Sequence, residues 1–145
     1  MAEALRVGIA GLGTVGASVV RVLAAKADEL TRQCGRPIVV TAVSARDRSR
    51  DRGIPLDGVK WFDDPVMLAK SDEIDVFVEL IGGEDGAARQ SVRAALDAGR
   101  HVVTANKALL ARHGLTLAEV AEKKGVLLNY EAAVAGGIPV IKTLR

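Results

Sequence analysis

The sequence predicts an α/β fold, a doubly wound and mostly parallel sheet with helices on both faces. Short apolar runs rich in β-branched residues alternate along the chain with stretches that have helical spacing. The β-rich runs are apolar at successive positions, as expected for strands that are covered on both faces. Hydrophobic residues make up 49% of the chain and aromatic residues only 3%, so the core is expected to consist of Val, Ile, Leu and Ala. A length of 145 residues suits one domain.

The composition also indicates which partners and which cellular compartment to expect. The formal charge is only +2, and Arg and Lys alternate with Asp and Glu, which argues against a nucleic-acid partner. The single cysteine, Cys34, cannot form an internal disulfide or a zinc site, which fits a reducing compartment. We find no signal region and no apolar run long enough to span a membrane. We therefore expect a cytoplasmic protein without a membrane partner.

The first half of the chain contains two expected strands, at 5–10 and 38–43, with a helix between them that runs from Val15 to about Leu30. The apolar positions of this helix recur at four-residue spacing and predict one buried stripe, formed by Val15, Val19, Leu23 and Ala27.

The second half alternates strands and helices in the same way. Asp64 and Pro65 have the pattern of a cap followed by proline in the first turn of a helix. The elements expected after that helix are a strand at 76–78, a helix at 86–98 stopped by Gly99, and a strand at 101–104. They are followed by a short helical segment at 107–111 capped by Asn106, a helix after the capping box of Thr116 and Glu119, and a strand at 126–130.

The motif "GLGTVG" follows the first strand and opens the first helix. In that context Gly11 makes the tight turn, Gly13 lets the backbone approach a pyrophosphate, and Gly16 lets the helix pack closely on the strand. The free amides of Thr14 and Val15 can then bind phosphate. We interpret the motif as a Rossmann-like dinucleotide site; the alternative is a structural glycine turn without a ligand.

The end of the second strand selects the dinucleotide. A carboxylate at this position binds the ribose 2′-hydroxyl of NAD, whereas an arginine can bind the 2′-phosphate of NADP. Arg46 favours NADP, although Asp47 beside it could serve as the NAD acid. The alternative is that the arginines of "ARDRSRDRG" form only a solvated loop.

Ligands of open α/β sheets bind at the carboxyl ends of the strands. The residues "NK", Asn106 and Lys107, come shortly after the fourth expected strand and are therefore expected at that edge of the sheet. Lys107 is therefore predicted to donate and accept a proton, with Thr104 and Asn106 available to orient it. Gly82 and Thr104 are expected on the cofactor side of the same edge. The alternative for Lys107 is a rim lysine that meets only solvent or phosphate, and we favour a structural role for Glu79.

The segment "YEAAVAGGIP" follows the last expected strand. Its small residues expose backbone carbonyls, which together with Glu131 could hold a hard cation. The alternative is a flexible hinge before a helix that starts at Pro139.

Together, "GLGTVG", "VELIGG", "VVTANKALLA" and "YEAAVAGGIPVIKTLR" resemble the N-terminal nucleotide-binding domain of homoserine dehydrogenase over essentially the whole chain. The resemblance implies reversible reduction of aspartate 4-semialdehyde to homoserine with NADPH or NADH, on the route to threonine, methionine and isoleucine. It implies that Gly11 to Gly16 bind pyrophosphate, that Arg46 marks NADP preference and that Lys107 lies at the nicotinamide and the substrate. It also implies a homodimer or homotetramer, and a sodium site formed by Glu131, Val134, Gly136 and Ile138.

By this resemblance, residues 1–131 form the dinucleotide-binding domain, and 132–145 form an interdomain loop and the start of a helix leading to a substrate and dimerisation domain that the chain lacks. We expect such a chain to bind cofactor without turning over substrate. Two alternatives remain: another amino-acid dehydrogenase, such as one acting on aspartate, and a non-enzymatic nucleotide-sensing module.

Overall fold

The structure is a computed structural model that describes residues 2–134. It alternates strands and helices as the sequence predicts, and the expected helix at Pro139 lies outside the described residues. The strands are β1 (Leu5–Ala10), β2 (Ile38–Ser44), β3 (Lys60–Phe62), β4 (Val76–Glu79), β5 (His101–Thr104) and β6 (Leu128–Asn129). The helices are α1 (Thr14–Ala25), α2 (Ala27–Cys34), α3 (Pro65–Lys70), α4 (Gly86–Asp97), α5 (Lys107–Lys124) and the short 3₁₀ helix η1 (Glu131–Ala133).

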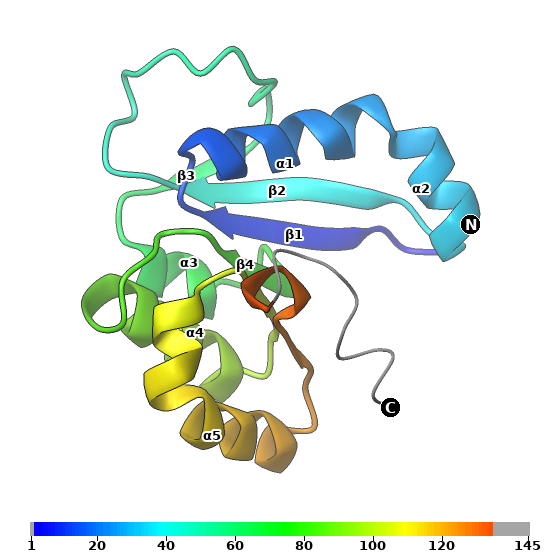
Figure 1. Ribbon diagram of the computed structural model, residues 1–145. Helices are drawn as coiled ribbons and strands as arrows, with labels where there is room; N and C mark the ends of the chain where they lie inside the picture. The colour runs from blue at the N-terminus through cyan, green and yellow to red at the C-terminus, as the bar shows by residue number, and fades with distance from the viewer. Residues whose placement is uncertain (1, 135–145) are drawn as a thin grey trace.

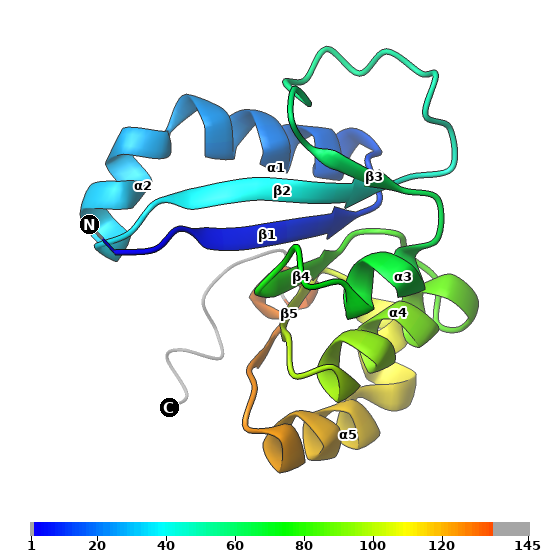
Figure 2. The ribbon, with the colours of Figure 1, turned by 180° about the vertical axis from the view of Figure 1, so that it is seen from behind.

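The strands form one parallel sheet in the order β3-β2-β1-β4-β5-β6. Helices α1 and α2 lie over one face, and α3, α4 and α5 lie over the other (Figures 1 and 2). The order reverses between β1 and β4, which is the switch point where ligands bind in sheets of this kind. The predicted doubly wound α/β fold is therefore confirmed. No helix within residues 2–134 is long and apolar enough to cross a membrane.

A hydrophobic core fills each side of the sheet. The core under α3, α4 and α5 includes Leu68, Phe77, Val92 and Leu109, all fully buried. The core under α1 is smaller and is built on Ile9, Val20 and Val43. Aliphatic side chains dominate both cores, as the composition predicts.

Two helix starts follow the sequence signals. The carboxylate of Asp64 accepts a hydrogen bond from the amide of Val66 at 2.8 Å, with Pro65 in the first turn. The side chain of Asn106 accepts one from the amide of Leu109 at 3.1 Å and so caps α5. Such caps satisfy amides that have no partner within the helix.

The first helix differs from its prediction in length and in orientation. The chain breaks at Lys26 into α1 and α2, so no single helix reaches Leu30. The predicted stripe is correct only at Val19, which packs against the core, and at Leu23, which is half-buried. It is wrong at Val15, which is 59% exposed, and at Ala27, which is exposed, while α1 buries Gly16, Ala17 and Val20. The cause is the contact of Gly16 with the backbone of Gly11, which turns the glycine side of α1 toward the sheet.

Three further elements differ. The segment expected at 107–111 and the helix expected after Thr116 form one helix, α5, with Gly114 in its interior. Gly in a helix costs about 1 kcal/mol, and burial of Leu109, Leu117 and Ala121 along the same helix offsets that cost. The expected strand at 126–130 is only β6, and the short edge strand β3 was not predicted.

Candidate functional site

Four residues line up across the carboxyl end of the sheet. The register pairs Ser44 of β2 with Ala10 of β1, Ala10 with Glu79 of β4, and Glu79 with Thr104 of β5. The loops that follow these strands therefore start at one level, on both sides of the switch point between β1 and β4. This arrangement gives a crevice the walls needed to hold an extended ligand.

The glycine loop between β1 and α1 is shaped by contacts that exclude side chains. A β-carbon on Gly11, where φ is +98°, would lie 2.5 Å from the carbonyl oxygen of Leu80, and one on Gly16 would overlap the carbonyl oxygen of Gly11. A β-carbon on Gly13 would meet nothing within 4 Å, so this glycine leaves open space beside the helix start. No side chain caps α1, so the amides of Thr14 and Val15 are available to an anion.

A cavity of about 380 Å³ lies beside this loop. Gly11 and Gly13 form one wall, and the segment after β2 forms another. Its charged lining residues are three arginines, Arg46, Arg50 and Arg52, and one carboxylate, Asp63. The cavity therefore combines a glycine turn with concentrated positive charge, which suits a phosphorylated ligand.

Arg46 and Asp47 differ in their surroundings. Arg46 is exposed and lines the cavity, whereas Asp47 is not among the lining residues. The Asp47 carboxylate accepts hydrogen bonds from the hydroxyl of Ser49 at 2.6 Å and from its amide at 2.9 Å. These hydrogen bonds, above all the one from the Ser49 hydroxyl, lower the pKa of Asp47. They also hold its carboxylate within its own loop. The acid that would select NAD is thus engaged locally.

Arg52 is a lining residue to which the sequence analysis gave no role other than the alternative of a solvated loop. Its Nε donates to the carbonyl oxygen of Leu12 in the glycine loop at 3.0 Å. Its guanidinium lies 5.7 Å from the ring centre of Trp61, and that of Arg48 lies 5.9 Å from the same ring. The arginine loop is therefore attached to the glycine loop, a relationship that no local sequence pattern indicates.

A second cavity, of about 160 Å³, lies next to the first, and Leu80 and Ile81, which follow β4, line both cavities. It is lined by residues from the ends of β4 and β5 and from the start of α1: Val15, Glu79, Leu80, Ile81, Gly82, Ala105 and Asn106. Gly82 has φ of +86°, which only glycine adopts readily.

A polar network forms the floor of this second cavity. The Glu79 carboxylate accepts hydrogen bonds from the amides of Ile81 and Gly82 at 2.7 and 3.0 Å, and from the hydroxyl of Thr104 at 2.6 Å. The hydroxyl oxygen of Thr104 in turn accepts a hydrogen bond from the backbone amide of Asn106 at 3.1 Å, and the side-chain amide of Asn106 donates to the carbonyl of Gly83 at 2.7 Å. The loops after β4 and β5 are thereby joined, and Glu79 is the structural acid that the sequence favours.

Lys107 is the first residue of α5, and its side chain is exposed beside Asn106. Within residues 2–134 it makes no ion pair and no side-chain hydrogen bond that would hold it. The side chains of Thr104 and Asn106, which we expected to orient Lys107, are instead engaged with Glu79, Gly83 and Leu109.

Charged side chains of α5 also contact the loop before α4, in addition to the bond between Asn106 and Gly83, and the sequence did not predict these contacts. His113 lies 3.0 Å from Asp85, and Arg112 lies 3.1 Å from Glu84. The hydrogen bond from His113 is the main cause of the lowered pKa of Asp85. These residues fasten the loop that carries Gly83 to the helix that carries Lys107.

The expected sodium ligands lie at the end of the described chain. Glu131 is exposed at the start of η1, and its carbonyl accepts the amide of Val134 at 3.1 Å. Gly136 and Ile138 lie outside the described residues. In the part of the chain that the structure describes, no three His, Cys, Asp or Glu side chains gather to hold a metal ion.

Comparisons with known proteins agree with this architecture. The homoserine dehydrogenase of Pseudomonas aeruginosa is 48% identical over 143 residues, covering 97% of this chain and 32% of its relative. A crystal structure of a homoserine dehydrogenase from Thiobacillus denitrificans superposes with a TM-score of 0.88 at 43% identity, over 98% of this chain and 32% of that one. A hyperthermophilic archaeal homoserine dehydrogenase in complex with NADPH has the same fold, with a TM-score of 0.78 at 24% identity over 99% of this chain and 48% of that one.

The chain spans about a third of the length of the curated relatives it matches. Residues 11–131 match the family described as "Homoserine dehydrogenase, NAD binding domain", which covers the glycine loop, both cavities and Lys107. The chain belongs to the homoserine dehydrogenase NAD-binding domain family.

Proposed function

We propose that the chain is the cofactor-binding part of an enzyme that reduces aspartate 4-semialdehyde to homoserine, reversibly, with a nicotinamide dinucleotide. The observation that carries the proposal is the pair of adjacent cavities at the switch point, which share Leu80 and Ile81 and meet the start of α1 at Gly13 and at Val15. An extended dinucleotide needs such a crevice, with its pyrophosphate at the uncapped start of α1. Open space at Gly13 leaves room for that pyrophosphate.

The two cavities suit the two ends of the cofactor. The adenosine end would occupy the arginine-lined cavity after β2, where Arg46 would bind a 2′-phosphate, and we therefore propose that NADP is preferred over NAD. Two observations favour this preference: Arg46 lines the cavity, and the carboxylate of Asp47 is engaged by Ser49. The nicotinamide end would occupy the cavity after β4 and β5, between Gly82 and Asn106.

Lys107 would act as the proton donor and acceptor for the substrate oxygen. Hydride that arrives at an aldehyde carbon leaves negative charge on the oxygen, which requires a nearby acid or cation. Lys107 is exposed at the carboxyl end of β5 and is held by no other side chain within residues 2–134, so it is free to meet a substrate. The remaining substrate contacts would come from a further domain in a homodimeric or homotetrameric enzyme.

We also propose the sodium site formed by Glu131 with the carbonyls of Val134, Gly136 and Ile138. One carboxylate and three carbonyl oxygens are donors that a hard cation accepts. Sodium would brace the segment that leaves the nucleotide-binding domain after η1.

Equilibrium binding to the 145-residue chain tests the proposal. NADPH fluorescence and calorimetry should show saturable binding of one dinucleotide per chain, and NADPH should bind more tightly than NADH. The same preparation should form no homoserine from aspartate 4-semialdehyde. Absence of binding for both cofactors would overturn the cofactor proposal, and turnover by the purified chain would overturn the assignment of substrate contacts to another domain.

A further inference from the structure

Glu79 is a fully buried carboxylate at the end of a central strand. Three groups donate hydrogen bonds to it: the amides of Ile81 and Gly82 to one oxygen, and the hydroxyl of Thr104 to the other. Since Thr104 already accepts the amide of Asn106, its own proton is free to point at Glu79. Within residues 2–134 the carboxylate is thus surrounded by three hydrogen-bond donors.

This negative charge has no cationic partner within residues 2–134. The ion pairs of that region involve Asp72, Glu73, Asp75, Glu84, Asp85, Asp97 and Glu29, but not Glu79. Neutral donors hold a buried carboxylate in place but do not cancel its charge. Its field therefore extends into the nearest cavity, where water and salt screen it weakly.

Glu79 lines the second cavity. If the nicotinamide end of the cofactor occupies this cavity, as the proposed function has it, the ring lies over a fixed negative charge. The oxidised ring is a cation and the dihydronicotinamide ring is neutral, so only the oxidised form gains from that charge.

On this basis we propose that Glu79 sets the redox-state preference of the site by favouring NADP⁺ over NADPH. The inference rests on the proposed function, because it needs the nicotinamide in the second cavity. Beyond joining two loops, Glu79 would then stabilise the form of the cofactor that carries positive charge. An apolar or neutral residue at this strand end could support the loops but could not supply that preference.

The test measures dissociation constants for NADP⁺ and NADPH with the wild-type chain and with Glu79→Gln. Glutamine has nearly the same shape and removes the charge, and its oxygen can still accept the amides of Ile81 and Gly82. Its amide nitrogen would face Thr104 and donate to the hydroxyl oxygen, so the direction of that one hydrogen bond reverses. We expect NADP⁺ to bind at least about tenfold more weakly and NADPH to change much less, because at an effective dielectric of about 20 a unit charge roughly 12 Å away already supplies that factor and a closer charge supplies more. The ratio of the two constants is the readout, since a merely structural role would weaken both forms alike.

Glu84→Gln is the matched control. Glu84 lies five positions further along the chain and loses the same charge, but its side chain is 49% exposed and pairs with Arg112. Solvent should screen its charge, so the ratio of the two dissociation constants should stay within about twofold of wild type.

Equal losses for NADP⁺ and NADPH in Glu79→Gln would overturn the inference and leave Glu79 a structural residue. If the wild-type chain binds neither form, the proposed function fails and the inference fails with it. If Glu79→Gln prevents folding, the wild-type chain alone decides the matter. Its preference for NADP⁺ must then persist between low salt and 0.5 M salt, because a buried charge is weakly screened; a preference that disappears in salt, or a preference for NADPH, would overturn the proposal.

Discussion

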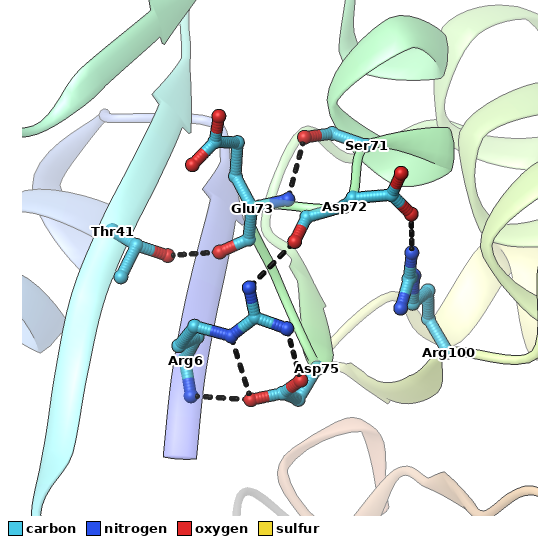
Figure 3. Close-up of polar contacts among 7 residues, drawn as sticks. All are labelled: Arg6, Thr41, Ser71, Asp72, Glu73, Asp75 and Arg100. Atoms are coloured by element: carbon cyan, nitrogen blue, oxygen red, sulfur yellow. Dashed lines mark hydrogen bonds and ion pairs between the residues drawn. The ribbon is translucent and has the colours of Figure 1, made fainter. Parts of the chain in front are cut away.

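Arg6 and Asp75 form a two-pronged ion pair across the amino-terminal ends of β1 and β4 (Figure 3). The Nη2 atom of Arg6 lies 2.7 Å from Oδ1 of Asp75, and its Nε lies 3.2 Å from Oδ2, which also accepts the Arg6 backbone amide at 2.9 Å. Arg6 donates further to the carbonyl of Asp72, and Thr41 donates to the carbonyl of Glu73. The loop between α3 and β4 is thus tied to β1 and β2, at the edge of the sheet opposite the site.

This pair should make stability depend on acid pH. The hydrogen bonds from the Arg6 side chain are the main cause of the lowered pKa of Asp75, whose ordinary value is 3.8. Because the folded-state pKa is the lower one, the stabilisation is fully present above pH 3.8 and is lost as the pH falls through the folded-state pKa. Asp75→Asn should therefore lower the melting temperature at pH 7, and its loss relative to wild type should shrink toward pH 2. Thermal denaturation across pH 2 to 7 measures this.

Asp72→Asn is the control for that measurement. Asp72 also pairs with an arginine, Arg100, at 2.7 Å, but the Asp72 side chain is fully exposed. An exposed pair contributes little because solvent screens it. Equal effects of Asp72→Asn and Asp75→Asn would contradict the importance that we give to the paired geometry of Arg6.

The glycine loop offers a substitution that separates binding from folding. Gly13→Ala adds a β-carbon where the chain itself has nothing within 4 Å, and φ of −74° suits alanine. It should change the free energy of unfolding by less than about 1 kcal/mol, the scale of a residue exchange at an uncapped helix start. The added methyl group would occupy space needed by the pyrophosphate, so NADPH binding should weaken by about tenfold or more. Chemical denaturation and cofactor titration measure the two effects.

Gly11→Ala, unlike Gly13→Ala, should lower the stability of the fold as its main effect. Its β-carbon would lie 2.5 Å from the carbonyl oxygen of Leu80, and φ of +98° is strained for alanine, so the fold itself should lose stability. A Gly13→Ala chain that binds NADPH as wild type does would show that the phosphate does not approach this loop.

Cofactor selection can be tested at Arg46. Arg46→Ala removes a guanidinium from the wall of the first cavity and should weaken NADPH while leaving NADH nearly unchanged, because only NADPH carries the 2′-phosphate. Fluorescence titration with both cofactors gives the comparison. Arg48→Ala is the matched control, since Arg48 lies over Trp61 and is not a lining residue of that cavity. Equal losses for NADPH and NADH in Arg46→Ala would show that Arg46 does not bind the 2′-phosphate.

The sequence predicts those parts of the fold that local chemistry determines. Continuous apolar runs identified β1, β2, β4 and β5, and the caps at Asp64 and Asn106 marked the starts of α3 and α5. The orientation of α1 could not be predicted from spacing, because a backbone contact between Gly16 and Gly11 decides it. Tertiary burial along α5 likewise overrides the break suggested by Gly114 and Thr116.

The candidate site likewise has residues that the sequence predicts and contacts that it does not. Gly11, Gly13 and Lys107 were found from motifs that are contiguous in the sequence. The hydrogen bonds of Arg52 with Leu12 and of Glu79 with Thr104 join residues 40 and 25 positions apart. The sheet register pairs Glu79 with Thr104, and the folding of two loops against each other pairs Arg52 with Leu12. No period or motif in one sequence encodes such pairs.

Lys107 carries the remaining prediction, which concerns the complete enzyme. Its amino group is exposed at the start of α5, beside the loop that Asn106 ties to Gly83. Lys107→Ala should lower kcat by about 10²-fold or more, the usual scale for the loss of a general acid or base. Cofactor dissociation constants should change much less, because the glycine loop holds the pyrophosphate independently. Steady-state kinetics with homoserine, together with NADPH titration, measure both quantities.

Lys107→Arg distinguishes proton transfer from simple charge. A guanidinium keeps the positive charge but does not release a proton near neutral pH, so it should restore little of the turnover. Lys123→Ala, at the far end of α5, is the matched control and should leave kcat within about twofold of wild type, since exposed surface substitutions rarely matter. If arginine restored most of the turnover, Lys107 would act only as an electrostatic clamp. The proton would then have to come from water or from a residue of another domain.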